Sequence, residues 1–176
     1  MFIALFDGDG GSAILLTGYQ QTINLDEIDD PRAAFEALEA AANNGMWVAL
    51  AADYALGACF EPAVPKSDVR RPMLRGWVYS RAQHLAVDAV DAFLQERLSA
   101  LPAHVRVAGV AELEPSLDAD RYVAKVEQVR RWIAEGDVYQ INLTFPIDFR
   151  LYGHPLALYA GLRKRQPVRY GAFIST

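Results

Sequence analysis

The pattern of apolar and polar residues changes its period once in the stretch from Asp120 to Thr144. Four apolar residues recur there at steps of four, three and four: Tyr122, Val126, Val129 and Ile133. This spacing predicts a helix with one apolar face, which an aspartate at 118 or 120 can cap and Gly136 can end in a left-handed conformation. From Val138 to Phe145 apolar and polar residues alternate, which predicts a strand.

One face of that predicted strand is polar. It carries Gln140, Asn142 and Thr144, while Tyr139 lies on the apolar face. A polar face either meets solvent or forms the wall of a polar cavity, and periodicity leaves both interpretations open.

Shorter patterns predict the other elements. The expected strands cover residues 2–6, 13–17, 20–25, 73–80, 105–110 and 170–175. A further strand is expected within residues 46–60, where the continuous apolar run predicts that both faces are covered. One expected helix begins at Asp29-Asp30-Pro31, and another runs from Pro155 to Pro167. A third covers 82–101 with Leu85, Ala89 and Phe93 inward and with Leu94, Leu98 and Leu101 as further inward candidates. We expect a hairpin turn at 7–11.

These elements predict the fold class and the domain organisation. The fold class is α/β of the α+β type, with antiparallel-rich sheets and helices packed outside. A linker at 112–118 predicts two subdomains, 1–115 and 116–176.

Composition narrows the class of protein. The chain has 176 residues, 52% of them hydrophobic, and a formal net charge of −5, which is typical of a soluble globular protein and argues against a nucleic-acid partner. We interpret the two basic clusters, at 70–75 and 163–169, as solvated faces. The single Cys59 excludes an internal disulfide and fits a reducing cytoplasm. No apolar run reaches the length of a membrane span, so no membrane association is predicted.

The sequence offers no catalytic or metal-binding constellation. The three histidines, His84, His104 and His154, have no spacing that would hold a metal ion, and no serine or cysteine lies near one in the sequence. We interpret them as surface or capping residues.

Three stretches resemble one enzyme family. The run 133–144, IAEGDVYQINLT, resembles the signature I-x-x-G-D-x-Y-Q-x-N-L-T of chorismate-utilising enzymes. The match is closest to component I of aminodeoxychorismate synthase, because anthranilate synthase relatives usually carry G-E-x-F-Q and lack N-L. Gly45 to Pro62 resembles the amino-terminal subdomain pattern G-x-W-V-A-G-x-L-x-Y-E…L-E-P, and 158–173 resembles L-Y-x-x-L-R-x-x-N-P-x-P-Y-x-A-F, with Gln166 and Arg169 as departures.

The resemblance implies a fold and an activity. The fold would be part of a two-sheet sandwich like that of anthranilate synthase component I. The parent enzyme would convert chorismate and ammonia to 4-amino-4-deoxychorismate, for para-aminobenzoate and folate synthesis. A glutamine amidotransferase subunit would supply the ammonia, and Mg2+ would bind the carboxylate of chorismate.

In the family the catalytic lysine and histidine and the two metal-binding glutamates follow this part of the sequence. We therefore expect the chain to be the amino-terminal part of a longer enzyme, inactive alone. We also expect the unpaired strand near 170–176 to promote self-association of the chain. The alternatives are anthranilate synthase component I, or a stand-alone module that binds a small molecule or a partner.

The resemblance also implies a candidate tryptophan pocket. Relatives hold tryptophan between the amino-terminal sheet and the segment equivalent to 166–171. By position Thr17, Tyr170 and Gly171 would line this pocket here, while Arg169 replaces a proline that packs on the indole. The alternative is a filled core.

Overall fold

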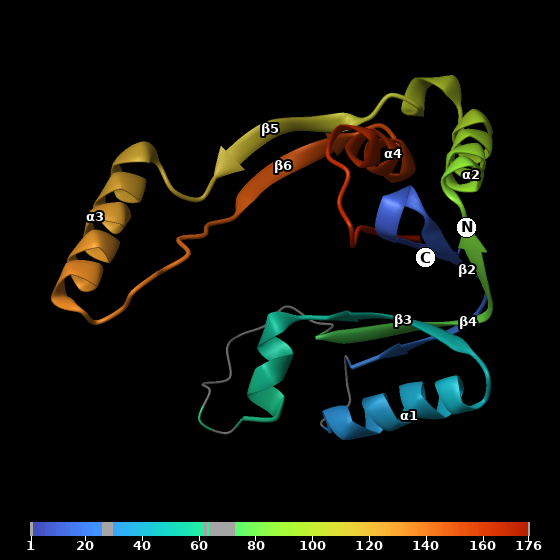
Figure 1. Ribbon diagram of the computed structural model, residues 1–176, viewed down its shortest axis with the longest axis horizontal. Helices are drawn as coiled ribbons and strands as arrows, with labels where there is room; N and C mark the ends of the chain where they lie inside the picture. Colours follow the sequence, from blue (N-terminus) through green and yellow to red (C-terminus); the bar gives the residue numbers. More distant parts are fainter. Residues whose placement is uncertain (1, 26–29, 62, 64–72, 176) are drawn as a thin grey trace. The chain divides into compact units, whose positions relative to one another are not determined.

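The computed structural model describes residues 2–25, 30–61, 63 and 73–175 (Figure 1). The chain forms two compact units, one of residues 1–96 with 162–176 and one of residues 97–161. Both combine helices with an antiparallel sheet, which confirms the predicted fold class. The predicted boundary after residue 115 stays a prediction.

The first unit is built on a five-stranded antiparallel sheet in the order β3-β4-β2-β1-β7. Its strands are β1 (Ile3–Asp7), β2 (Ala13–Asn24), β3 (Trp47–Ala52), β4 (Leu74–Leu85) and β7 (Ala172–Ser175). β1 and β2 form the predicted hairpin, joined by the 3-10 turn η1 (Asp9–Gly11). The two strands expected at 13–17 and 20–25 are one strand, because a bulge between Tyr19 and Gln21 lets the pairing with β4 continue.

Helix α1 (Pro31–Asn43) covers one face of this sheet, and its start follows the prediction. The carboxylate of Asp30 accepts a hydrogen bond of 2.9 Å from the backbone N–H of Arg32, and Pro31 occupies the first turn. Asp29 lies outside the described residues. A core cluster joins α1, the sheet and the 3-10 helix η2 (Tyr54–Cys59); its buried members are Leu25, Ala34, Leu38, Leu56 and Leu74.

Two predictions for this unit are wrong. β3 was expected to be covered on both sides, yet it is the outermost strand and only its Ala49 is buried. An apolar run shows strand propensity, whereas cover depends on a neighbouring element. Helix α2 (Val87–Ser99) begins later than expected, because residues 82–85 extend β4 and pair with β2. Its buried residues are Val90 and Leu94, so the further candidate Leu94 is confirmed, whereas Ala89 is exposed and Phe93 is half-buried.

The strand expected at the carboxyl end is present as β7. It pairs with β1 from Ile3 opposite Ser175 to Phe6 opposite Ala172. The expectation of an unpaired strand is therefore wrong for one of its edges. Self-association of the chain stays a prediction.

The second unit contains a two-stranded sheet of β5 (Gly109–Pro115) and β6 (Ile147–Tyr152). The strand predicted at 105–110 is thus displaced toward the expected linker. The short helix η3 (Ala103–Val105) precedes the hairpin and α4 (Pro155–Arg165) follows it. His154 acts as a capping residue, as one interpretation expected: its Nδ1 accepts from the backbone N–H of Leu156 at 3.1 Å.

Helix α3 (Ala119–Glu135) forms as predicted. Asp118 accepts a hydrogen bond of 2.8 Å from the backbone N–H of Arg121, and Gly136 ends the helix at φ +84°. No residue of α3 is buried, although one face of the helix is apolar and carries Tyr122, Val126, Val129 and Ile133.

The prediction of a strand at 138–145 is wrong, because this segment belongs to neither sheet. No other segment in the described part of the chain pairs with it, and a ladder requires such a partner. The burial of side chains still alternates along this segment: Ile141, Leu143 and Phe145 are half-buried, while the polar residues between them are exposed.

None of the helices within the described ranges is long and apolar enough to span a membrane.

Candidate functional site

The residues of the family signature lie along α3 in the second unit. Together they form the signature groove, a hollow of about 480 Å³ lined by Tyr122, Val126, Val129, Arg130, Ile141, Asn142, Leu143 and Thr144. The rings of Tyr122 and Phe145 meet edge to face, with centroids 5.9 Å apart. The apolar face of α3 therefore lies against the signature segment itself.

Only two of the four predicted signature residues line the signature groove. Asn142 and Thr144 line the signature groove, whereas Gln140 is exposed outside it and Tyr139 is 93% exposed. The groove thus combines apolar walls with an amide, a hydroxyl and the guanidinium of Arg130. These groups are suited to binding and orienting a polar molecule, and none of them is a carboxylate base.

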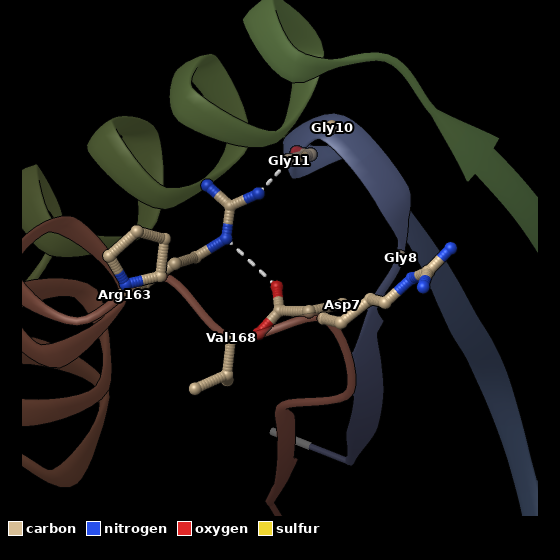
Figure 2. Close-up of a pocket in the computed structure, with 8 residues that line it drawn as sticks. Asp7, Gly8, Gly10, Gly11, Arg163 and Val168 are labelled. Carbon is tan, nitrogen blue, oxygen red and sulfur yellow. Dashed lines mark hydrogen bonds and ion pairs between the residues drawn. The ribbon is translucent and has the colours of Figure 1, made fainter.

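A second candidate lies in the first unit, beside the turn between β1 and β2 (Figure 2). We call it the turn pocket; its volume is about 430 Å³, and it is lined by Asp7, Gly8, Gly10, Gly11, Arg163, Pro167, Val168 and Arg169. The end of β1 supplies Asp7, and the last turn of α4 supplies Arg163.

Arg163 is the centre of the turn pocket. Its Nε donates to Asp7 Oδ1 at 2.8 Å, and its Nη2 donates to the carbonyl oxygen of Gly11 (Figure 2). Its Nη1 lies 3.4 Å from Asp91 Oδ1. The Arg163 and Asp7 side chains are only 12% and 5% exposed. A buried ion pair of this kind fixes geometry, because separating the two charges would weaken an interaction that offsets their desolvation.

An exposed ion pair adjoins the same pocket. Arg169 holds Asp9 through both carboxylate oxygens, with Nη2 at 3.0 Å from Oδ2, and its guanidinium lies 5.8 Å from the centre of the Tyr170 ring. The hydrogen bond from Arg169 lowers the pKa of Asp9, and the same bond raises the pKa of Arg169. The departure from the family pattern at 169 thus connects the segment 166–171 to the β1–β2 turn.

The candidate tryptophan-pocket residues occupy two places. The carbonyl oxygen of Gly171 accepts a 2.8 Å hydrogen bond from the backbone N–H of Asp7, and the neighbouring Tyr170 is 83% exposed. Thr17 is half-buried on β2, next to Leu16, which pairs with Ala4. Ala4 and Asp7 are three residues apart along β1, roughly 10 Å. The structure groups Gly171 with Asp7 and does not bring Thr17 to them; the tryptophan pocket stays a prediction.

Sequence reasoning missed the role of Arg163. We interpreted the basic cluster 163–169 as a solvated face, and for Arg163 this is wrong. The available signals were an aspartate directly after the apolar run of β1 and the arginine of the L-Y-x-x-L-R pattern. Arg75 of the other cluster is also only half exposed, while Arg70 and Arg71 lie outside the described residues.

No group of three histidine, cysteine, aspartate or glutamate side chains among the described residues is placed to hold a metal ion. Magnesium prefers carboxylate oxygens in octahedral geometry. The described residues therefore do not fit a magnesium ion.

Comparison with known proteins decides the family. A sequence profile of the chorismate binding enzymes matches residues 4–176. This chain belongs to the chorismate binding enzyme family. Pro62, the last residue of the second resemblance, lies outside the described residues, whereas the signature and the segment 158–173 are described throughout.

Two curated relatives of this chorismate binding enzyme match over short stretches. Anthranilate synthase component 1 of Methanothermobacter thermautotrophicus is 46% identical over 50 residues, which is 28% of this chain and 11% of the relative. Aminodeoxychorismate synthase component 1 of Bacillus subtilis is 37% identical over 57 residues, which is 32% of this chain and 12% of the relative. Each match therefore spans only a small part of the relative's length.

Proposed function

We propose that this chain is the amino-terminal part of an aminodeoxychorismate synthase component I. The observation that carries the proposal is the signature segment of a chorismate binding enzyme with Tyr139, and with Asn142-Leu143, at the positions that distinguish this branch. The reaction replaces the hydroxyl of chorismate by an amino group: ammonia adds, water leaves, and the enolpyruvyl group is retained.

In this proposal the described residues bind and position, and the chemistry is completed by other parts of the enzyme. The signature groove supplies an amide from Asn142 and a hydroxyl from Thr144 beside an apolar wall. Such groups orient a polar cyclic acid without exchanging protons with it. A glutamine amidotransferase that delivers ammonia and Mg2+ that binds the carboxylate of chorismate belong to the same proposal.

Anthranilate synthase component I is the second candidate, and the higher identity of its short match favours it. The two reactions differ in one product. Anthranilate formation eliminates the enolpyruvyl group as pyruvate, whereas aminodeoxychorismate formation does not.

The test uses the natural full-length protein with chorismate, ammonium chloride and magnesium chloride. We expect chorismate consumption without pyruvate release, and a product whose mass retains the enolpyruvyl group. Equimolar anthranilate and pyruvate would establish the second candidate instead. Chorismate left unconsumed by the folded protein would reject both candidates.

Two further samples locate the contribution of the signature groove. Asn142→Ala is expected to lower turnover at least tenfold, while Arg150→Ala, an exposed change on β6, leaves it unchanged. The 176-residue chain is assayed alone beside them. Turnover by this chain would show that its own residues carry the chemistry and would contradict the division of roles proposed above.

A further inference from the structure

Glycine follows aspartate or asparagine at three places in the sequence: Asp7-Gly8, Asp9-Gly10 and Asn44-Gly45. Such pairs are chemically labile, because glycine has no side chain to shield its main-chain nitrogen from the side-chain carbonyl carbon of the preceding residue. Attack by that nitrogen closes a five-membered imide, which opens by hydrolysis to aspartate or isoaspartate. The surroundings of each pair in the folded chain therefore decide which of the three can react.

Two of the three pairs have their glycine nitrogen engaged by the fold. The N–H of Gly8 donates to the carbonyl oxygen of Ser12 at 2.9 Å, and that of Gly45 donates to the carbonyl oxygen of Ala42 at 2.9 Å. The side chain of Asp7 is in addition only 5% exposed. An engaged nitrogen and a buried carboxyl group both hinder ring closure, so these two pairs are protected in the native state.

The pair Asp9-Gly10 lacks both kinds of protection. Gly10 is the second residue of η1, ahead of the first N–H that a 3-10 turn can bond internally. Outside that turn, its N–H has no backbone acceptor among the described residues. A side chain at Gly10 would meet nothing within 4 Å, and the Asp9 side chain is 69% exposed, so the surroundings of this pair are open.

Arg169 holds the carboxyl group of Asp9. It contacts both carboxylate oxygens, with Nη2 3.0 Å from Oδ2, and it comes from the segment between α4 and β7. Ring closure requires the carboxyl group to rotate onto the next main-chain nitrogen and to be protonated, since one of its oxygens leaves as water. The two-point contact opposes the rotation. The hydrogen bond from Arg169 also lowers the pKa of Asp9, which opposes protonation.

We propose that Asp9 is a site of spontaneous isoaspartate formation and that Arg169 restrains this reaction in the native protein. The nitrogen of Gly10 forms a C–N bond to the carboxyl carbon of Asp9, and the hydroxyl of the protonated carboxyl leaves as water with the proton of that nitrogen. Hydrolysis of the imide then consumes one water, so the product has the composition of the starting chain. This site goes beyond the proposed function and does not depend on it.

Isoaspartate at position 9 would change the turn between β1 and β2. Its main chain is one carbon longer, and its carboxylate is attached at a different carbon from the one that Arg169 holds in place. The turn is tight and contains two glycines with left-handed φ, +64° at Gly10 and +82° at Gly11. An additional main-chain atom would therefore rearrange the turn, and with it the turn pocket that both glycines line.

The test follows isoaspartate in the natural full-length protein during incubation for weeks at neutral pH. A methyltransferase specific for isoaspartate labels it, and electron-transfer fragmentation of the peptides assigns the label to a residue. We expect isoaspartate to form faster at Asp9 than at Asp7, and faster than Asn44 loses ammonia. In the protein unfolded in guanidinium chloride, Asp7 and Asp9 should react at similar rates. Isoaspartate that forms at Asp7 as fast as at Asp9 in the folded protein overturns the proposal.

Two variants test the restraint by Arg169. Arg169→Gln should accelerate isoaspartate formation at Asp9 about two- to fivefold, the factor that an exposed ion pair supplies. Arg165→Gln removes the same charge from an exposed position of α4, so it is the matched control and should leave the rate unchanged. Equal rates in Arg169→Gln and the natural protein overturn the proposal.

A third variant identifies the reacting carboxyl group. Asp9→Glu keeps a negative charge for Arg169, but ring closure by a glutamate side chain gives a six-membered imide, which forms much more slowly. We expect labelling at position 9 to disappear while Asn44 keeps its rate. Both exchanged side chains are mostly exposed in the natural protein, so the variants should fold. Unchanged labelling of the turn in Asp9→Glu would assign the reaction to Asp7 and overturn the proposal.

Discussion

The two units of the molecule use similar amphipathic patterns with different outcomes. In the first unit the sheet and α1 bury their apolar side chains, and Leu5, Leu25 and Leu74 are fully buried. In the second unit α3 buries none of its residues, and all six residues of β6 are exposed. Periodicity therefore specifies which face of an element is apolar, while a second element decides whether that face is covered.

The largest expected contrast concerns two ion pairs. Arg163→Met removes a buried guanidinium that binds the buried carboxylate of Asp7, so we expect a loss of about 3–5 kcal/mol in the free energy of unfolding. The matched control is Arg150→Met in the second unit, which removes an exposed pair with Glu112 and should cost less than about 1 kcal/mol. Urea denaturation measures both. Equal losses would show that burial does not separate the two units.

A second contrast compares two leucines. Leu74→Ala opens a cavity in the core of the first unit and should cost about 2–5 kcal/mol. Leu113 on β5 is 58% exposed, so Leu113→Ala should change the stability by no more than about 0.5 kcal/mol. The same urea titrations report both values. A large effect at Leu113 would mean that something covers β5 in solution.

A third contrast compares the same substitution, glycine to alanine, at two positions where its effects on stability should have opposite signs. Gly76→Ala places a methyl group against Leu38, and overpacking of this kind costs about 1–3 kcal/mol. Gly161 lies inside α4 with nothing near its missing side chain, so Gly161→Ala should stabilise the protein by about 0.5–1 kcal/mol. Thermal melts distinguish the two. Destabilisation by both would contradict the open surroundings of Gly161.

The smallest expected effect is a pH dependence at the rim of the turn pocket. Arg169 lowers the pKa of Asp9 relative to the unfolded chain, so the pair stabilises the fold above the unfolded pKa. This contribution is lost as the pH falls through the lowered, folded-state pKa. Arg169→Gln should return the pKa of Asp9 toward its ordinary value, as followed by the carboxyl ¹³C shift during an acid titration. An unchanged titration curve would show that the pair does not persist in solution.

Features encoded within a few residues could be predicted from the sequence. The caps at Asp30 and Asp118 and the left-handed Gly136 follow from local hydrogen bonding and backbone sterics, and the structure confirms all three. The hairpin at 7–11 has the same local origin.

Features that join distant residues could not be predicted in this way. The Arg163–Asp7 pair connects positions 156 apart in the sequence, and no periodic pattern marks it. The length of β2 depends on its pairing with β4, which carries the strand through Gly18 despite a left-handed φ of +69°. The segment 138–145 has the alternation of a strand but lacks a partner among the described residues, so an intrinsic preference did not become a sheet.

The pairing of β7 with β1 has a consequence for biosynthesis. Ile3 pairs with Ser175, so β1 leaves the ribosome well before its partner β7 has been synthesised. At about 5–20 residues per second, translation of the intervening chain takes roughly 10–30 s. During that interval one edge of β1 has no neighbour and is open to pairing with other chains. The speed of translation and the availability of chaperones should therefore influence how much of this protein reaches its native state.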